Sequence, residues 1–238
     1  GPARVLPPDL ANEPAAQRPG QGASRKVPAC YNPASRREGV AGSFGGAVLS
    51  EDLLASVLTA AWNGELELLQ LIDHCSKLEQ SRRAPLAAIL YQTWLRRTRS
   101  PHAHLAYFNL GATLTNLGEL TSAEEAYRQA IALSPGFIQP RLNLGLLLER
   151  MGSPEKAVEE WRWIERNVPA DTPEQKALLI LALNNLGRAL EISKQYRDAT
   201  DYLSRSLALD SDQPDVLHHW VFLRQKQCCW PVYLPVGD

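Results

Sequence analysis

Hydrophobic positions recur every three to four residues after the first 50, a period that predicts amphipathic helices. The first expected helix takes Ser50 as its N-cap and ends at Asn63-Gly64. A second helix is expected from residue 65 to about 78, and a third begins at Pro85. The last two are expected to pair, so residues 50–103 are interpreted as degenerate N-terminal helical repeats.

The next part of the chain repeats itself with a fixed period. Pro101, Pro135 and Pro169 are equally spaced. The same interval separates further pairs: Gly111 and Gly145, Gly118 and Gly152, Ala123 and Ala157, Leu110 and Leu144, Leu114 and Leu148. A shared period of about 34 residues is typical of a repeat built from two helices. Four residue types in one register indicate a repeat architecture rather than coincidence.

In these positions the chain resembles the tetratricopeptide repeat family. The resemblance predicts an all-α, right-handed superhelical solenoid of tetratricopeptide helical hairpins. Three repeats are expected, over residues 104–137, 138–171 and 172–213. Gly111, on the first helix of its repeat, is expected to face the neighbourhood of Ala123, so that two small residues let the helices approach closely.

The third repeat departs from the pattern. Ser211 stands where a proline is expected, and the interval from Gly145 to Gly187 is longer than the repeat period. Thr172-Pro173 is typical of an N-cap and a first helical residue, which predicts that the extra residues lengthen the start of a helix.

The two ends of the chain differ from the repeats. Residues 1–49 are rich in Pro and Gly without hydrophobic period, which predicts a disordered tail; its Gly1-Pro2 start resembles the remnant of an expression tag. Residues 214–238 are expected to form a capping helix, from Asp215 to about Cys228, and a junction to a further domain.

Composition restricts the partners. The formal net charge is −1, so there is no excess of basic residues to bind nucleic acid or a membrane surface. The apolar stretch from Ala177 to Leu183 is too short to span a bilayer. No secretory signal is visible, and the four cysteines match neither a disulfide framework nor a zinc site, so a cytoplasmic protein is expected.

Candidate binding residues follow from the resemblance, which implies that the first helix of each repeat lines the concave side. Each repeat carries Asn-Leu-Gly there, beginning at Asn109, Asn143 and Asn185. An asparagine amide offers a donor and an acceptor that match a peptide backbone, so we expect these three side chains to face an open groove and bind an extended peptide. The alternative is that they bridge neighbouring helices within the protein.

The Asn-Leu-Gly repetition is similar to the asparagine ladder of O-linked N-acetylglucosamine transferases. The C-terminal residues look like the segment that joins repeats to the catalytic domain in bacterial SPINDLY-like members, with Cys229 in place of Asp: His219, Leu223, Arg224, Gln225, Cys228 and Trp230-Pro231. The resemblance implies a parent protein that is a nucleotide-sugar-dependent glycosyltransferase with its catalytic domain downstream.

No catalytic triad, nucleotide-binding glycine motif or metal cluster is recognisable, so we expect no catalytic residue, metal or cofactor in this chain. The acid pairs Glu124/Glu125 and Glu159/Glu160 are interpreted as solvated helix faces. The expected function is recognition of a protein acceptor. The alternative is a stand-alone repeat adaptor or a homodimerisation scaffold without a link to glycosylation.

Overall fold

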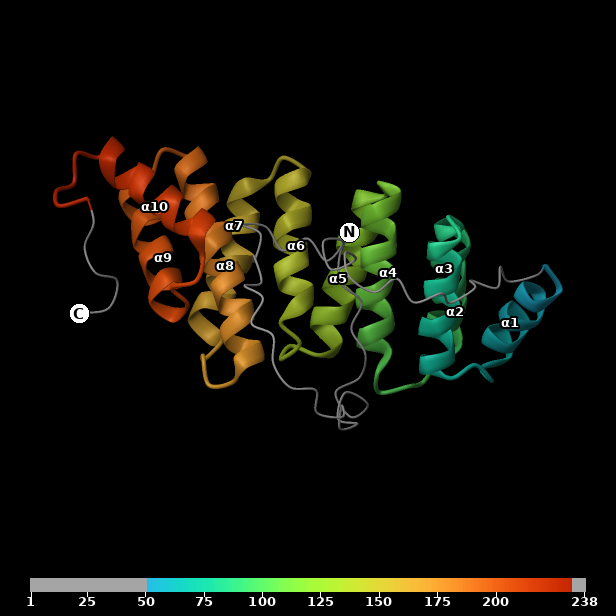
Figure 1. Ribbon diagram of the computed structural model, residues 1–238. Coiled ribbons are helices and arrows are strands. Elements are labelled where there is room, and N and C mark those ends of the chain that lie inside the picture. The colour runs from blue at the N-terminus through green and yellow to red at the C-terminus, as the bar shows by residue number, and fades with distance from the viewer. Residues whose placement is uncertain (1–50, 233–238) are drawn as a thin grey trace, which may run out of the picture. The chain divides into compact units, whose positions relative to one another are not determined.

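The computed structural model describes residues 51–232, and within them the chain forms ten α-helices and no strand. Their bounds are α1 Glu51–Asn63, α2 Leu68–Gln80, α3 Ala84–Arg97, α4 Ala103–Leu117, α5 Leu120–Leu133, α6 Gln139–Arg150, α7 Pro154–Asn167, α8 Pro173–Ile192, α9 Tyr196–Leu209 and α10 Pro214–Lys226. The all-α fold is therefore confirmed (Figure 1). The expectations for residues 1–50, including Ser50 as an N-cap, and for 233–238 lie outside the described residues.

The described chain divides into two compact units between Pro140 and Arg141, within the first turn of α6. This division does not coincide with a boundary of the expected repeats, of which the nearest falls after Phe137. The handedness of the solenoid and the assignment of segments to repeats stay predictions.

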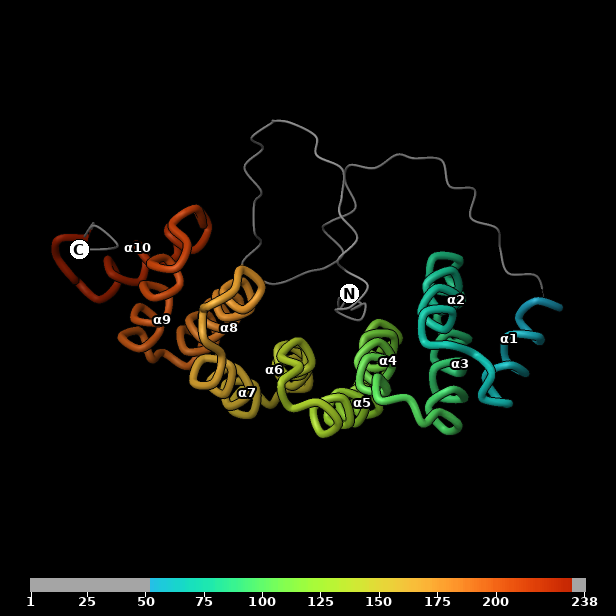
Figure 2. Tube along the Cα trace, turned by 90° about the horizontal axis from the view of Figure 1, so that it is seen from below, coloured from blue at the N-terminus to red at the C-terminus, as the bar shows by residue number. Residues whose placement is uncertain are grey.

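In the first unit, neighbouring helices pack against one another: α3 contacts α1, α2 and α4, and α4 contacts α5. Figure 2 shows α2 and α3 side by side. The buried Trp94 indole donates a hydrogen bond from Nε1 to the carbonyl oxygen of Leu66, at 2.6 Å, which attaches α3 to the segment before α2. The expected pairing of the second and third helices is thus present.

The glycine at the centre of each hairpin lies under a bulky side chain of the second helix. A Cβ on Gly111 would come within 2.7 Å of the Tyr127 ring, and one on Gly145 within 2.2 Å of the Trp161 indole. Gly111 was expected to face the neighbourhood of Ala123; the atoms nearest to it belong to Tyr127, one helical turn further along α5. A glycine leaves a depression in the first helix, and a large side chain from the second helix fills it more completely than alanine would.

In the second unit, α8 is the lengthened helix that the sequence predicts, with 20 residues. The hydroxyl of its N-cap Thr172 accepts a hydrogen bond from the Gln175 main-chain NH, and the Gln175 side chain accepts one from the Thr172 NH. This reciprocal pair satisfies two donors that a helix start leaves unbonded. The predicted N-cap is confirmed.

The C-terminal end of the second unit is a packed cap. Buried side chains from α8, α9 and α10 form one cluster: Leu190, Ala199, Leu203, Leu207, Val216, Trp220 and Leu223. On α10, the Arg224 guanidinium lies 4.9 Å from the Trp220 ring centroid. It donates hydrogen bonds to the carbonyl oxygens of Pro231 and Val232, which follow the helix. The chain after α10 is thereby held against that helix.

Candidate functional site

The three asparagines predicted to bind a peptide lie on the first helices of their hairpins, Asn109 on α4, Asn143 on α6 and Asn185 on α8. Their side chains are buried, with exposed fractions of 0%, 6% and 0%. The expectation that they face an open groove is therefore wrong. Each asparagine lies among apolar residues on a helix that is buried on several sides. A ligand can therefore reach its amide only if the groups that cover the amide move.

In the second unit, three polar atoms of the two candidate amides have no hydrogen-bond partner among the described residues. Asn143 Nδ2, and both Nδ2 and Oδ1 of Asn185, are buried without a hydrogen-bond partner in the described part of the chain. A buried polar group left unbonded costs about 1 to 3 kcal/mol in stability. The alternative role as a bridge between helices is consequently not what the Asn185 side chain does here.

A neighbouring amide shows what a bridge looks like in this fold. Asn184 Nδ2 donates to Gln213 Oε1 at 2.9 Å, and Gln213 Nε2 donates to the carbonyl oxygens of Ser206 and Asp210. This buried network joins α8 and α9 to the start of α10. No short sequence pattern indicates it, because Gln213 lies 29 residues from Asn184 along the chain.

Ion pairs connect helices of successive hairpins in the second unit. The Arg188 guanidinium on α8 donates to both carboxylate oxygens of Glu149 on α6, at 2.6 and 2.7 Å. Arg205 on α9 pairs with Glu165 on α7 at 2.6 Å, and His219 on α10 pairs with Glu191 on α8. Arg188 is three residues after Asn185 and so lies one turn away on the same face. The Glu149–Arg188 pair therefore holds α6 beside α8 close to the unbonded amide.

In the first unit an equivalent polar link lies near Asn109. The Thr113 hydroxyl, four residues further along α4, donates to the Glu79 carboxylate at 2.6 Å and so joins α4 to α2. Sequence spacing alone did not indicate these links, because the partners stand 28 to 40 residues apart.

Two histidines of the first unit have perturbed acidity. Burial lowers the pKa of His104, although a hydrogen bond to the Pro101 carbonyl oxygen opposes this and nearby His102 adds to it. Its ring packs edge-on against Phe137, with centroids 5.5 Å apart. Burial also lowers the pKa of His74, with Asp73 opposing and Lys77 adding to the effect.

The acidic pairs are engaged in part. Glu124 binds Arg128 at 2.8 Å within α5, and Glu160 binds Arg141 at 2.8 Å. Among residues 51–232, no group of three His, Cys, Asp or Glu side chains could hold a metal ion, and no helix there is long and apolar enough to cross a membrane. The side chains gathered at the candidate site are amides and paired charges, which can form directional hydrogen bonds to a ligand.

Comparison with known proteins agrees with the helical pattern. Residues 104–137 match the model of the tetratricopeptide repeat. No curated protein matches the chain.

Several solved structures are similar in fold. A structure titled "Crystal structure of MamA" has 22% sequence identity and a TM-score of 0.55, over 67% of this chain and 86% of that one. MamA 41-end from Desulfovibrio magneticus RS-1 has 17% identity and a TM-score of 0.54, over 67% and 84%. BtubC from P. vanneervenii has 16% identity and a TM-score of 0.58, over 80% and 87%. At these identities the likeness shows the fold alone.

Proposed function

We propose that this chain is a protein-binding module that holds an extended segment of a partner protein along the first helices of its hairpins. The observation that carries the proposal is the repeated asparagine with buried, unbonded polar atoms: Nδ2 of Asn143, and both Nδ2 and Oδ1 of Asn185. An unbonded buried polar group in a native protein calls for an explanation, such as a water molecule or a ligand that completes it. A peptide backbone offers the NH and carbonyl groups that complete an amide.

Geometry supports an extended ligand. A strand advances about 3.4 Å per residue, and packed helices lie about 8 to 10 Å apart, so amides on successive first helices would meet roughly every third peptide unit. Because such contacts use backbone atoms, binding should tolerate changes in ligand sequence. Asn109 belongs to the first unit, and we propose for it the same kind of contact there, separate from that of Asn143 and Asn185.

The experiment is a titration of the protein with unstructured, uncharged peptides of unrelated sequences, each paired with a version N-methylated along its backbone. Methylation removes the NH donors and leaves the side chains in place. The proposal expects several of the unmodified peptides to bind and their methylated versions to lose at least about tenfold in affinity, which is about 1.4 kcal/mol. Equal affinities within each pair would refute backbone recognition.

A more specific proposal is that the module recognises the acceptor of a protein O-glycosyltransferase whose catalytic domain uses a nucleotide sugar. Its support is the C-terminal segment that resembles the junction of SPINDLY-like members. In that segment Leu223 is buried, and Arg224 holds the chain at Pro231 and Val232. The alternative is a stand-alone adaptor, or a scaffold that forms homodimers, and the fold accommodates either. The gene beyond the codon for Asp238 discriminates: a nucleotide-sugar-binding α/β domain supports the first, and a stop codon contradicts it.

A further inference from the structure

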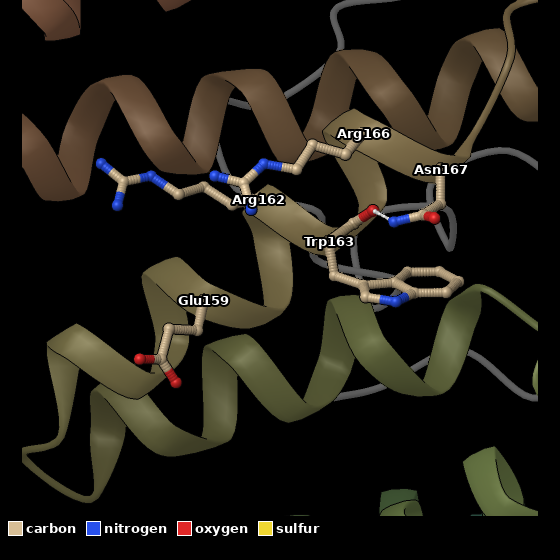
Figure 3. A pocket seen from close by; sticks show the side chains of 5 residues that line it. All are labelled: Glu159, Arg162, Trp163, Arg166 and Asn167. Carbon is tan, nitrogen blue, oxygen red and sulfur yellow. Dashed lines mark hydrogen bonds between the residues drawn. The ribbon is translucent and has the colours of Figure 1, made fainter.

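A second surface of the second unit has the features of a peptide site. Two hollows adjoin along α7 and share Glu159 and Arg162 in their walls. One encloses about 310 Å³, and Arg162, Trp163 and Arg166 line it (Figure 3). The other encloses about 230 Å³. Its apolar side is formed by Pro154, Val158 and Leu190. We call the two together the α7 groove.

Two arginines of the α7 groove have no carboxylate partner in the described chain. Arg162 and Arg166 stand four residues apart, and Figure 3 shows their side chains extending in the same direction, away from Trp163. Like charges at this spacing repel and destabilise a helix. The helix dipole explains a basic residue in the last turn, as at Arg166, but not the second one at Arg162.

Two of the four glutamates of α7 pair with arginines outside the groove, Glu160 with Arg141 and Glu165 with Arg205. They therefore do not neutralise Arg162 or Arg166. Glu159, in the wall of the first hollow, and Glu155, in the wall of the second, form no ion pair in the described structure. The first hollow keeps a net positive charge of one (two arginines and one glutamate), and Glu155 adds a negative charge in the second hollow.

The wall of the first hollow is fixed in place. The Arg141 guanidinium stacks on the Trp163 ring, 3.9 Å from its centroid, and Asn167 Nδ2 donates to the Trp163 carbonyl oxygen at 2.8 Å. A wall that is already ordered loses little conformational entropy when a ligand arrives.

We propose that the α7 groove binds an acidic segment of a partner protein, in which carboxylates and apolar side chains are neighbours. Carboxylates of the segment pair with Arg162 and Arg166, because the planar guanidinium donates two parallel hydrogen bonds to a carboxylate. Apolar side chains of the same segment fill the second hollow, beside Pro154, Val158 and Leu190. The groove shares no residue with the asparagine site, so this second contact is separate from the backbone recognition proposed above.

The test uses a short fluorescein-labelled peptide in which two glutamates, one residue apart, precede two leucines, and a control peptide with glutamines in their place. Fluorescence polarisation should show the acidic peptide binding at least about tenfold more tightly than the control, since charge-assisted hydrogen bonds are about twice as strong as neutral ones. R162E/R166E should remove this difference. R197E, which changes an exposed arginine on α9, should keep it.

Three outcomes would overturn the proposal: equal affinity for the two peptides, R162E/R166E behaving like R197E, or no binding of the acidic peptide at millimolar concentration. Sedimentation of the free protein tests another occupant. A dimer that R162E/R166E dissociates would assign the groove to a second copy of the chain and likewise overturn the proposal. N143L/N185L should keep the difference in affinity between the two peptides, because their backbones are the same, so failure of the asparagine proposal would leave this result unchanged.

Discussion

Arg188 and Glu149, which are 39 residues apart in sequence, form a bidentate ion pair between α8 and α6, and both side chains are only about a quarter exposed. A pair of this geometry and burial contributes more than a solvated one, because both hydrogen bonds are charge-assisted and screening by water is reduced. Arg188 also lies one turn from Asn185 on the same face of α8.

Replacing Arg188 by Met should therefore lower the free energy of unfolding by about 1.5 to 3 kcal/mol, since the Glu149 carboxylate is left without its two donors. Urea denaturation checks this. D73N is the control: it breaks the Asp73–Lys77 pair, whose side chains are about half exposed, and should change stability by no more than about 0.5 kcal/mol. Equal effects of the two substitutions would mean that the Arg188 pair is no stronger than a surface pair.

Replacement of a hairpin glycine by alanine should change the melting temperature by an amount that depends on the side chain above that glycine. In a helix interior, alanine is more favourable than glycine by about 1 kcal/mol because of its higher helix propensity. A side chain forced into an occupied space lowers stability by about 1 to 3 kcal/mol. The Trp161 indole cannot turn away from Gly145 without losing its hydrogen bond from Nε1 to the Leu142 carbonyl oxygen. A Cβ on Gly187 would come within 2.5 Å of Cδ2 and 2.7 Å of Cγ of Leu203, an apolar side chain that can shift without losing a hydrogen bond. G145A should thus lower the melting temperature, and G187A should lower it less.

The control for this series is G136A. A Cβ at Gly136 would meet nothing within 4 Å, so this substitution should leave the melting temperature unchanged or raise it slightly. If G145A melts like G136A, the indole does not occupy the space above the glycine.

Stability of the first unit should fall as the pH drops below about 6.5. His74 and His104 have pKa values lowered in the folded protein, chiefly by burial, so the unfolded chain binds protons there first. A fall in pH stabilises the state that binds more protons, and here that is the unfolded state. The loss begins near the unfolded pKa and is complete below the folded ones. Urea midpoints at pH 7.5 and 5.5 measure it, and H74Q/H104Q should reduce the difference; an unchanged difference would contradict the assignment.

The sequence predicted those features that depend on neighbours along the chain. The repeat period located the first and second helices around Gly111 and Gly145, and Thr172-Pro173 located the start of α8, because caps and helix periods are local signals. It did not predict that Tyr127 and Trp161 cover the glycines, since that depends on how far one helix is displaced along the other.

The candidate site was predicted only in part. The repetition identified Asn109, Asn143 and Asn185, but not their burial, which is a property of the packed helices. The Asn184–Gln213 bond and the Glu149–Arg188 pair join residues 29 and 39 positions apart. Such pairs depend on the stacking of successive hairpins, which no short sequence pattern specifies.

The buried, unbonded amide of Asn185 should lower the stability of the second unit. Leucine has a similar volume and no polar atoms, so N185L should stabilise the second unit by about 1 kcal/mol or more, an increase of a few degrees in melting temperature for a chain of this size. A decrease in melting temperature would show that the amide is bonded within the protein and acts as a bridge.

Asn143 and Asn185 are proposed to bind an extended peptide through their amides. The most direct measurement is the affinity of N143L/N185L for unmodified peptides that bind the natural chain, with circular dichroism to monitor the helices. We predict unchanged helicity and a loss of more than about tenfold in affinity, because each lost hydrogen-bonding site costs about 0.5 to 1.5 kcal/mol. A folded variant that binds these peptides as tightly as the natural chain would contradict the claim.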